Sequence, residues 1–267
     1  MKKLFCLVFV FALLGCVPKP PCGLEWREPM SVEMTNPAGA QYISFSPVTA
    51  VTGLTQRTYA LWFRPDVVNI DQSLFGTYYN ASSQDNEYVL LSAATGAKVD
   101  FWANWETSGG WWRTSSNQLT AATWAHIVVT YDASLTTNDP IIYINGVSVS
   151  ITEVSTPAGA WWSGSNSDLA ISDPDYAVAA ADGKFADARV YNTILSAADV
   201  LALYNAGAFS PSYDTNLVFH APLTNATNLG GSAFNGYTLT SSTKLIDRIN
   251  CAQGTPSGSP LGSSTNP

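Results

Sequence analysis

The sequence carries little charge and is poor in histidine, cysteine and long apolar runs. Asp, Glu, Lys and Arg make up 12% of its 267 residues, and acidic residues outnumber basic ones by 20 to 12. Because proteins bind phosphate groups with a basic surface, nucleic acid is not an expected partner. The surface must instead be solvated largely by Ser, Thr, Asn and Gly, as in many extracellular β proteins.

The one long apolar run lies at the N-terminus, from Leu4 to Leu14, after two lysines. It is too short to span a bilayer comfortably and is typical of a secretory signal. It ends in LLGC, which resembles the bacterial lipobox, where the cysteine is acylated and becomes the mature N-terminus. We therefore expect residues 1–15 to be a signal peptide and Cys16 to be lipidated. A plain signal peptide or an uncleaved anchor is the alternative.

This reading predicts an exported protein held at the outer membrane or cell surface. Val17 stands where an inner-membrane retention aspartate would follow the lipidated cysteine, and it favours the outer membrane or surface. The acyl chains bury methylene groups at about 0.8 kcal/mol each, so the anchor is durable.

The four cysteines then reduce to one pair, because Cys6 leaves with the signal and Cys16 is acylated. Two cysteines left in an exported protein usually pair, and a sandwich often brings its terminal strands together, so we expect a disulfide between Cys22 and Cys251. Two unpaired thiols or metal ligation are the alternatives. We divide the mature chain into a proline-rich stalk at 16–30, a domain at 31–251 and a disordered tail at 252–267.

Between the stalk and the tail, the sequence predicts many short strands and one helix. Segments such as QYISFS, TYALWFRP and AHIVVTYD alternate apolar and polar residues and end in Gly, Asn, Asp, Ser or Pro. Asn145 and Gly146 give the signal of a two-residue hairpin. The helix should begin after Ser196 as N-cap, with Asp199 three residues on, stop at Gly207, and pack against the sheet through Leu201, Leu203 and Tyr204. One short helix among many strands indicates an all-β sandwich with the helix at its margin.

Five segments in order resemble the laminin G-like domains of the concanavalin A-like lectin and glucanase superfamily. They are TYALWFRPD, LTAATWAHIVVTYDAS, IYINGVSVS, DLAIS and DGKFADARVYNTILSAADVLALYNAG, and they span roughly residues 40–207. The resemblance implies an antiparallel two-sheet jelly roll with one short peripheral helix, used chiefly to recognise glycans or proteins at surfaces. The segment at 216–240 looks like the opening strand of another such unit, but we expect it to complete this sandwich, with a truncated repeat as the alternative.

The resemblance also bears on His126, which lies two residues after Trp124 at the entry of a central strand. Trp124, His126 and Val128 share one face of that strand. No serine or cysteine nucleophile motif accompanies the histidine. We therefore expect His126 to be a hydrogen-bonded structural residue at the end of the core and not a catalyst.

The sequence does not predict a glycoside hydrolase. The glucanases of the superfamily carry their carboxylates on one strand in an E-x-D-x-x-E pattern, which this sequence lacks, and Glu87, Asp100 and Glu106 are isolated. We expect a non-catalytic surface domain that binds carbohydrate for adhesion or glycan capture. The alternative is a structural or protein-interaction module of a surface or virion assembly.

Tryptophans in two loop regions are the candidate ligand contacts. The first region, WANWETSGGWWRT, contains Trp102, Trp105 and a Trp-Trp pair at 111 and 112. The second, PAGAWWSGSNS, contains a Trp-Trp pair at 161 and 162. Successive strand residues point to opposite faces, so one ring of each Trp-Trp pair should face outward, where a sugar could stack on it. Packing of both pairs in the core and edge is the alternative reading. The candidate binding residues are Trp105, Trp111, Trp112, Trp161, Trp162, Asn104 and Arg113.

No cofactor is required by this reading, and calcium is the one candidate ion. Laminin G-like domains often hold a calcium ion at the sandwich rim through aspartate and backbone oxygens. The segment ISDPDYAVAAADGKFAD offers several aspartates, of which Asp173 and Asp175 are the first pair to consider. Aspartates beside Pro and Gly also commonly make turns.

Overall fold

The computed structural model describes the chain from residue 31 to residue 263 with gaps. The described residues are 31–34, 42–45, 50–51, 53–78, 87–94, 96–162, 168–172, 180–208, 215–221 and 223, with short strands at 233–234, 237–238, 254–257 and 261–263. The predicted signal peptide and stalk, with Cys16 and Cys22, and also Cys251, lie outside these residues. No helix within the described ranges is long and apolar enough to cross a membrane.

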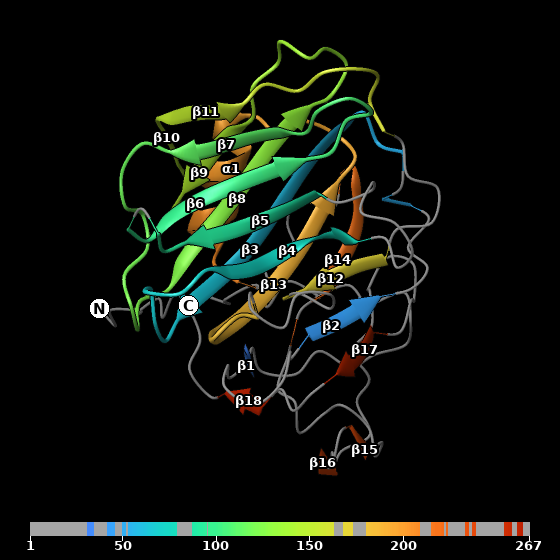
Figure 1. Ribbon diagram of the computed structural model, residues 1–267. Helices are drawn as coiled ribbons and strands as arrows, with labels where there is room; N and C mark the ends of the chain where they lie inside the picture. The colour runs from blue at the N-terminus through green and yellow to red at the C-terminus, as the bar shows by residue number, and fades with distance from the viewer. Residues whose placement is uncertain are drawn as a thin grey trace, which may run out of the picture.

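Two eight-stranded antiparallel sheets form the body of the protein (Figure 1). Sheet A contains, in spatial order, β10 (Val147–Val149), β9 (Ile141–Ile144), β8 (Ala125–Asp132), β3 (Gln56–Pro65), β13 (Gly183–Tyr191), β1 (Ser31–Met34) and β18 (Leu261–Ser263), and β14 (Leu217–Ala221) also pairs with β13. Sheet B contains β11 (Ile151–Ser155), β7 (Gly110–Thr114), β6 (Lys98–Ala103), β5 (Glu87–Ser92), β4 (Gln72–Tyr78), β12 (Asp168–Ile171), β2 (Tyr42–Phe45) and β17 (Gly254–Ser257). The predicted two-sheet, jelly-roll-type sandwich is confirmed.

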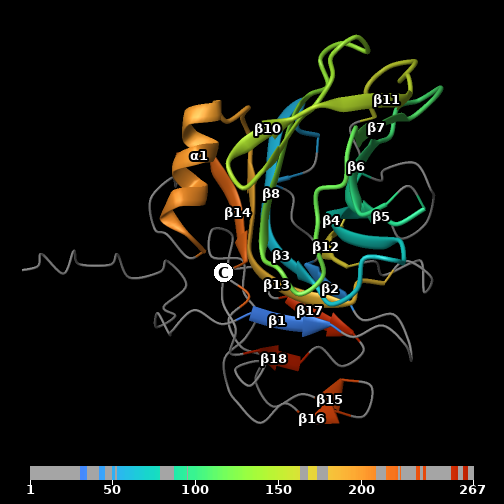
Figure 2. The ribbon, with the colours of Figure 1, turned by 90° about the vertical axis from the view of Figure 1, so that its left-hand side faces the viewer.

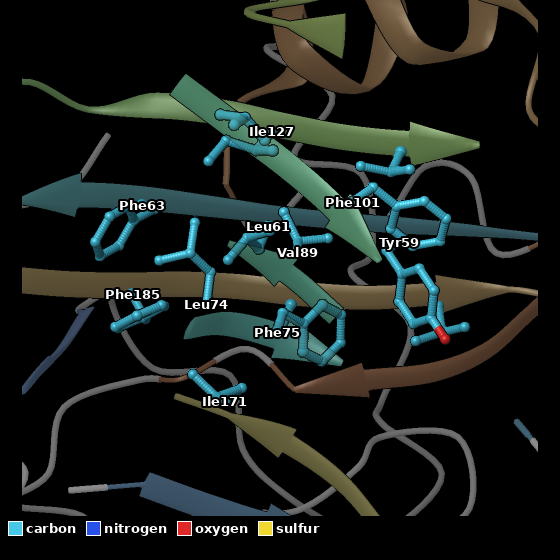
Figure 3. Close-up of a cluster of buried hydrophobic side chains, with 14 of the residues drawn as sticks. Tyr59, Leu61, Phe63, Leu74, Phe75, Val89, Phe101, Ile127, Ile171 and Phe185 are labelled. Atoms are coloured by element: carbon cyan, nitrogen blue, oxygen red, sulfur yellow. The ribbon is translucent and has the colours of Figure 1, made fainter. Parts of the chain in front are cut away.

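The core lies between the two sheets and is rich in aromatic rings. Figure 3 shows side chains from both sheets meeting in this layer. Phe63 and Phe185 of sheet A lie 4.7 Å apart between ring centroids, and Tyr59 meets Phe75 of sheet B edge-on at 5.6 Å. Each ring of this kind contributes about 1.5–3 kcal/mol when fully buried. The sandwich is therefore stabilised mainly by burial of its inner faces.

The helix α1 (Ala197–Ala206) forms a third layer on the outer face of sheet A (Figure 2). Figure 2 shows α1 (Ala197–Ala206) on one side, sheet A in the middle and β4 to β7 of sheet B on the other side. Val200 and Leu203 of α1 are buried in a cluster with Ala60, Val128 and Tyr143 of sheet A. Strands β3 and β8 are accordingly buried on both faces, whereas β5 and β7 alternate buried and half-buried residues. Among the described elements, none packs on the outer face of sheet B.

The ends of α1 follow the predicted capping pattern. The side chain of Ser196 accepts a hydrogen bond from the amide of Asp199, whose carboxylate accepts one from the Ser196 amide. Gly207 follows the last helical residue with φ of 73°. The expectation that Leu201 packs against the sheet is wrong, because Leu201 is 44% exposed and Val200 takes the buried position. The hairpin at Asn145 and Gly146 is confirmed, since both have positive φ.

The C-terminal part differs from the sequence prediction in two respects. As expected, β14 joins this sandwich by pairing with β13, but β15 (Ala233–Phe234) and β16 (Tyr237–Thr238), also in the segment expected to complete the sandwich, form a separate two-stranded sheet. Within the segment predicted as a disordered tail, β17 pairs with β2 and β18 pairs with β1. These two strands use edge hydrogen-bonding groups of the sheets, so burial of apolar side chains is not needed to place them.

Candidate functional site

The half-buried outer face of sheet B carries the candidate site, and strand alternation decides which rings reach it. On β6 and β7, Phe101 and Trp112 are opposite each other and fully buried in the core. Their neighbours Trp102 and Trp111 are also paired across the strands, but they point outward and are half-buried. The Trp111–Trp112 pair thus sends one ring to each face, as the alternation predicts.

Three outward rings lie in a row across β5, β6 and β7, and we call Tyr88, Trp102 and Trp111 the aromatic row. The rings of Tyr88 and Trp102 are nearly parallel, with 9° between their planes and 6.4 Å between centroids. Trp111 continues the row 6.0 Å from Trp102 at an interplanar angle of 53°. Cross-strand aromatic pairs of this kind hold each other in place, so the row is a preorganised surface.

Polar groups surround the Trp111 end of this row. The Asp100 carboxylate accepts a hydrogen bond from Trp111 Nε1 at 2.8 Å and is bound by Arg113 through Nε at 2.8 Å and Nη2 at 2.6 Å. The Arg113 guanidinium carbon also lies 4.8 Å from the centroid of the Trp111 ring. Its hydrogen bond with Asp100 is the main reason that the pKa of Arg113 is raised. Arg113 is therefore fixed beside Trp111, and its role as a binding residue stays a prediction.

Asn104 lies near Trp102, the middle ring of the row, where Gly109 leaves room for both side chains. A Cβ added at Gly109 would lie 2.7 Å from Cζ2 of Trp102 and 3.2 Å from Oδ1 of Asn104. The absence of a side chain at Gly109 allows the tryptophan ring and the amide to approach each other over the loop. The predicted polar residues Asn104 and Arg113 thus lie beside two rings of the aromatic row, Trp102 and Trp111 respectively.

Trp105 and Trp112 are in the core, and their prediction as ligand contacts is not supported by their positions. Trp112 is fully buried and donates from Nε1 to Asp139 at 2.7 Å. Trp105 is 6% exposed and donates from Nε1 to the Tyr131 hydroxyl at 3.1 Å. An indole that finds an internal acceptor can be buried at little cost, which is why these rings face inward.

Trp161 and Trp162 are half-buried, and Trp161 forms an isolated β-bridge with Trp105. Trp161 packs edge-on against Trp105 at 5.3 Å, and the guanidinium of Arg57 lies 4.2 Å from the Trp161 ring centroid. Arg57 also forms a buried ion pair with Glu87 at 2.8 Å. Burial raises the pKa of Glu87, although Arg57 and a hydrogen bond from Tyr59 act in the opposite direction. Trp161 is thus mainly a packing residue.

His126 is structural, but not in the way that the sequence suggested. It lies under α1 on the outer face of sheet A and not at the end of the inter-sheet core. Its ring contacts Trp62 at 5.0 Å and Tyr204 of α1 at 6.1 Å, and Nδ1 is buried without a hydrogen-bond partner. Burial lowers the pKa of His126 to about 3, so the imidazole is neutral at physiological pH. The ring holds the helix by packing.

A second buried polar group beneath α1 joins β13 to β14. Asp187 has φ of 51°, lies at a register shift in β13, and binds Arg189 at 3.0 Å and His220 of β14 at 2.6 Å. These two partners hold the pKa of Asp187 well below its usual range, against the effect of burial. Asp187, which the sequence offered among several aspartates for calcium, is thus used in an ion cluster.

The calcium prediction stays a prediction. Asp173 and Asp175 lie outside the described residues, and the described ranges contain no group of three or more His, Cys, Asp or Glu side chains arranged to hold a metal ion.

The fold defines a two-layer β-sandwich of the jelly-roll type with one helix on sheet A. A laminin G-type family model, described as Concanavalin A-like lectin/glucanases superfamily, matches residues 37–201. The chain therefore belongs to this superfamily, which confirms the resemblance seen in the sequence. A comparison with curated protein sequences finds no match.

Solved structures with the same fold are distant in sequence. A candidate carbohydrate-binding protein from Bacteroides ovatus matches with a TM-score of 0.56 and 14% identity, over 88% of this chain and 62% of that chain. A SAP-like pentraxin from Limulus polyphemus matches with a TM-score of 0.55 and 10% identity, over 88% of this chain and 94% of that one. This chain thus spans less than two thirds of the Bacteroides protein. At these identities the likeness establishes the fold.

Tyr88, Trp102 and Asp100 were not among the candidate binding residues predicted from the sequence. Those candidates included Trp105, which is buried, whereas Trp102 faces outward. The signal for Trp102 was available, because the apolar residues Val99, Phe101 and Ala103 alternate with it and are all buried in the core. Nothing in the sequence alone placed Tyr88 opposite Trp102, because that pairing depends on the register between β5 and β6.

Proposed function

We propose that this chain is a non-catalytic recognition domain that binds carbohydrate on the outer face of sheet B. The observation that carries the proposal is the aromatic row, which lies on a sheet face that no described element covers. Sugar rings stack their apolar faces on such aromatic side chains, and nearby amide and guanidinium groups bond their hydroxyls. Asn104 supplies such a group near Trp102, in the middle of the row, and Arg113 supplies one beside Trp111.

The shared fold supports the ligand class. The Bacteroides ovatus protein of the same fold is described as a candidate carbohydrate-binding protein. The superfamily to which the chain belongs is named for lectins and glucanases.

The state of the buried carboxylates supports binding without hydrolysis. In the described part of the chain, the three buried acidic residues are Glu87, Asp100 and Asp187. Each of them is bound to an arginine, respectively Arg57, Arg113 and Arg189. Glycoside hydrolysis uses two carboxyl groups that flank one bond, about 5–9.5 Å apart, with at least one free to donate a proton. Carboxylates neutralised by arginine do not suit that role.

The test is glycan binding by the full mature chain and by variants of the row. We expect the wild-type protein to retain a subset of glycans on an array and Trp102→Ala with Trp111→Ala to lose at least about tenfold in affinity, since each stacked ring contributes substantially to binding. Leu135→Ala is the matched control, because Leu135 is 59% exposed and lies outside the row. Retention of no glycan by the wild-type protein would overturn the proposal.

We also propose, from the sequence alone, that the domain is exported and anchored through a lipid on Cys16. An anchor of this kind would present the domain to extracellular glycans. The Cys22–Cys251 disulfide and the calcium ion at Asp173 and Asp175 are further proposals that come from the sequence alone.

A protein partner is the second candidate, and exposed apolar residues favour it. Val147 in β10 is 62% exposed and Leu201 in α1 is 44% exposed. The two residues flank the position of Gly146, whose added Cβ would lie 2.9 Å from Leu201 Cδ1. If a protein binds this chain and Val147→Ser with Leu201→Ser abolishes binding while the row variants do not, this second function replaces the first.

A further inference from the structure

The ion pair beside Trp111 determines the charge that a ligand of the aromatic row meets. Asp100 is 1% exposed and uses both carboxylate oxygens on Arg113, in the bidentate arrangement that neutralises a guanidinium most completely. The side chain of Arg113 is 17% exposed. A ligand at this position therefore meets a cation whose charge is already balanced by a fixed anion.

The remaining charges near the pair do not restore a positive field. Lys98 is half-buried on the same face of β6 as Asp100, but Asp71 lies close enough to raise the pKa of Arg113 electrostatically. The positive charges of Arg113 and Lys98 are thus matched by the negative charges of Asp100 and Asp71. The chain as a whole carries a formal net charge of −8, which repels polyanions at longer range.

Arg113 still keeps a donor for an uncharged partner. Its Nε binds Asp100, and its Nη2 binds Asp100 and the hydroxyl of Ser92 at 3.0 Å, but Nη1 has no hydrogen-bond partner in the described part of the chain. A neutral hydroxyl can accept a hydrogen bond from Nη1 without displacing Asp100. A carboxylate or sulfate would be placed close to the Asp100 carboxylate and would be repelled by it.

We propose that the aromatic row selects uncharged glycans over acidic ones, and that Asp100 sets this selectivity by neutralising Arg113. This inference rests on the proposed function and narrows its ligand to neutral sugars. Asp100 acts as a specificity-determining residue through Arg113, because selectivity of this kind arises from a repulsive group placed against the wrong ligand.

The test uses probe pairs that share a backbone and differ in charge. They are hydroxyethyl cellulose with carboxymethyl cellulose, methyl-esterified with de-esterified homogalacturonan, and lactose with sialyllactose. For any pair that binds, we expect the mature wild-type chain to prefer the neutral member by about tenfold or more. Asp100→Asn, which leaves Arg113 positively charged, should reduce that preference to about threefold or less.

A matched control removes the same charge elsewhere. Asp66 is paired with Arg64 at 2.6 Å at the end of β3 in sheet A, so Asp66→Asn changes the net charge equally and should leave the preference unchanged. A second measurement does not depend on the stability of Asp100→Asn: raising the salt concentration from about 50 to 500 mM should narrow the wild-type preference by screening the repulsion.

The outcomes distinguish failure of the proposed selectivity for neutral sugars from failure of the proposed carbohydrate binding. Tighter wild-type binding of acidic members, or a preference that neither salt nor Asp100→Asn alters, overturns the selectivity while carbohydrate binding stands. Absence of binding to every member of the pairs and to a glycan array removes both.

Discussion

Trp111 and Trp112 are consecutive in the chain but belong to opposite faces of sheet B. Trp112 is fully buried between the sheets and donates to Asp139, whereas Trp111 is half-buried on the outer face and donates to Asp100. Because side chains alternate along a strand, the same residue type in adjacent positions performs two roles. Trp112 stabilises the sandwich, and Trp111 shapes its surface.

The two tryptophans should respond differently to truncation. Trp112→Ala removes a fully buried ring and leaves Asp139 without its donor, so we expect it to lower the free energy of unfolding by about 3–5 kcal/mol. Trp111→Ala should lower it by about 1 kcal/mol or less, since the ring is half-buried. Urea denaturation of both variants measures the difference. Equal losses would mean that the two rings do not have the separate roles assigned to them.

Alanine substitutions at Gly109 and Gly110, which precede Trp111 and Trp112, test the same difference between a surface ring and a core ring without removing either ring. A Cβ added at Gly110 would lie 2.1 Å from Cη2 of Trp112, whereas one added at Gly109 would lie 2.7 Å from Cζ2 of Trp102. Gly110→Ala must displace a core ring, and we expect a loss of stability of about 1–3 kcal/mol.

Gly109→Ala should instead move Trp102 within the aromatic row. We expect weaker glycan binding with a smaller loss of stability than for Gly110→Ala, measured by binding titration and thermal unfolding of both variants. If Gly109→Ala leaves affinity unchanged, Trp102 does not contact the ligand.

His126 should make stability depend on pH. Its pKa is about 3 in the folded protein, lowered mainly by burial, and about 6.5 when unfolded. As pH falls below 6.5, the unfolded chain takes up a proton that the folded chain does not, so the free energy of unfolding decreases by up to about 1.4 kcal/mol per pH unit until about pH 3.

Replacing His126 by an aromatic residue that does not titrate separates the pH dependence caused by the imidazole from the packing of the ring. His126→Phe keeps an aromatic ring beside Trp62 and Tyr204 and should remove that part of the pH dependence. Denaturant unfolding at pH 7, 6, 5 and 4 should show the wild-type protein losing about 3 kcal/mol more than the variant between pH 7 and 4. Parallel pH profiles would show that the imidazole is accessible to protons in the folded state.

The N-terminal proposal has a direct chemical test. Intact mass measurement of the protein expressed in a bacterium should show loss of residues 1–15 and an added acyl mass on Cys16. A Cys16→Ser variant should lack the acyl mass and leave the membrane fraction. An intact Met1 on the wild-type protein would contradict both the cleavage and the anchor.

The sequence was sufficient for the architecture because the relevant signals are local. The strand at 125–132, the Asn145–Gly146 turn and the Ser196 cap are each predicted from neighbouring residues, and the structure has all three. The position of Leu201 was mispredicted because a short apolar helix offers several faces, and contact with sheet A selects the one with Val200 and Leu203.

The site was predicted less well because it depends on register and on partners that are distant in sequence. The outward position of Trp111 followed from alternation alone. The row itself requires Tyr88 to pair with Trp102 and Trp102 with Trp111. The inward position of Trp105 depends on Tyr131, 26 residues away in the sequence, and no pattern of spacing reports such a contact.

The central claim is that the outer face of sheet B binds carbohydrate through the aromatic row. The most direct measurement is a crystal structure of the mature chain with an oligosaccharide selected by glycan array. We predict a sugar ring in contact with Trp102 or Trp111 and within hydrogen-bond distance of Arg113. A sugar bound beside Trp161 and Trp162, with the row unoccupied, would contradict the claim.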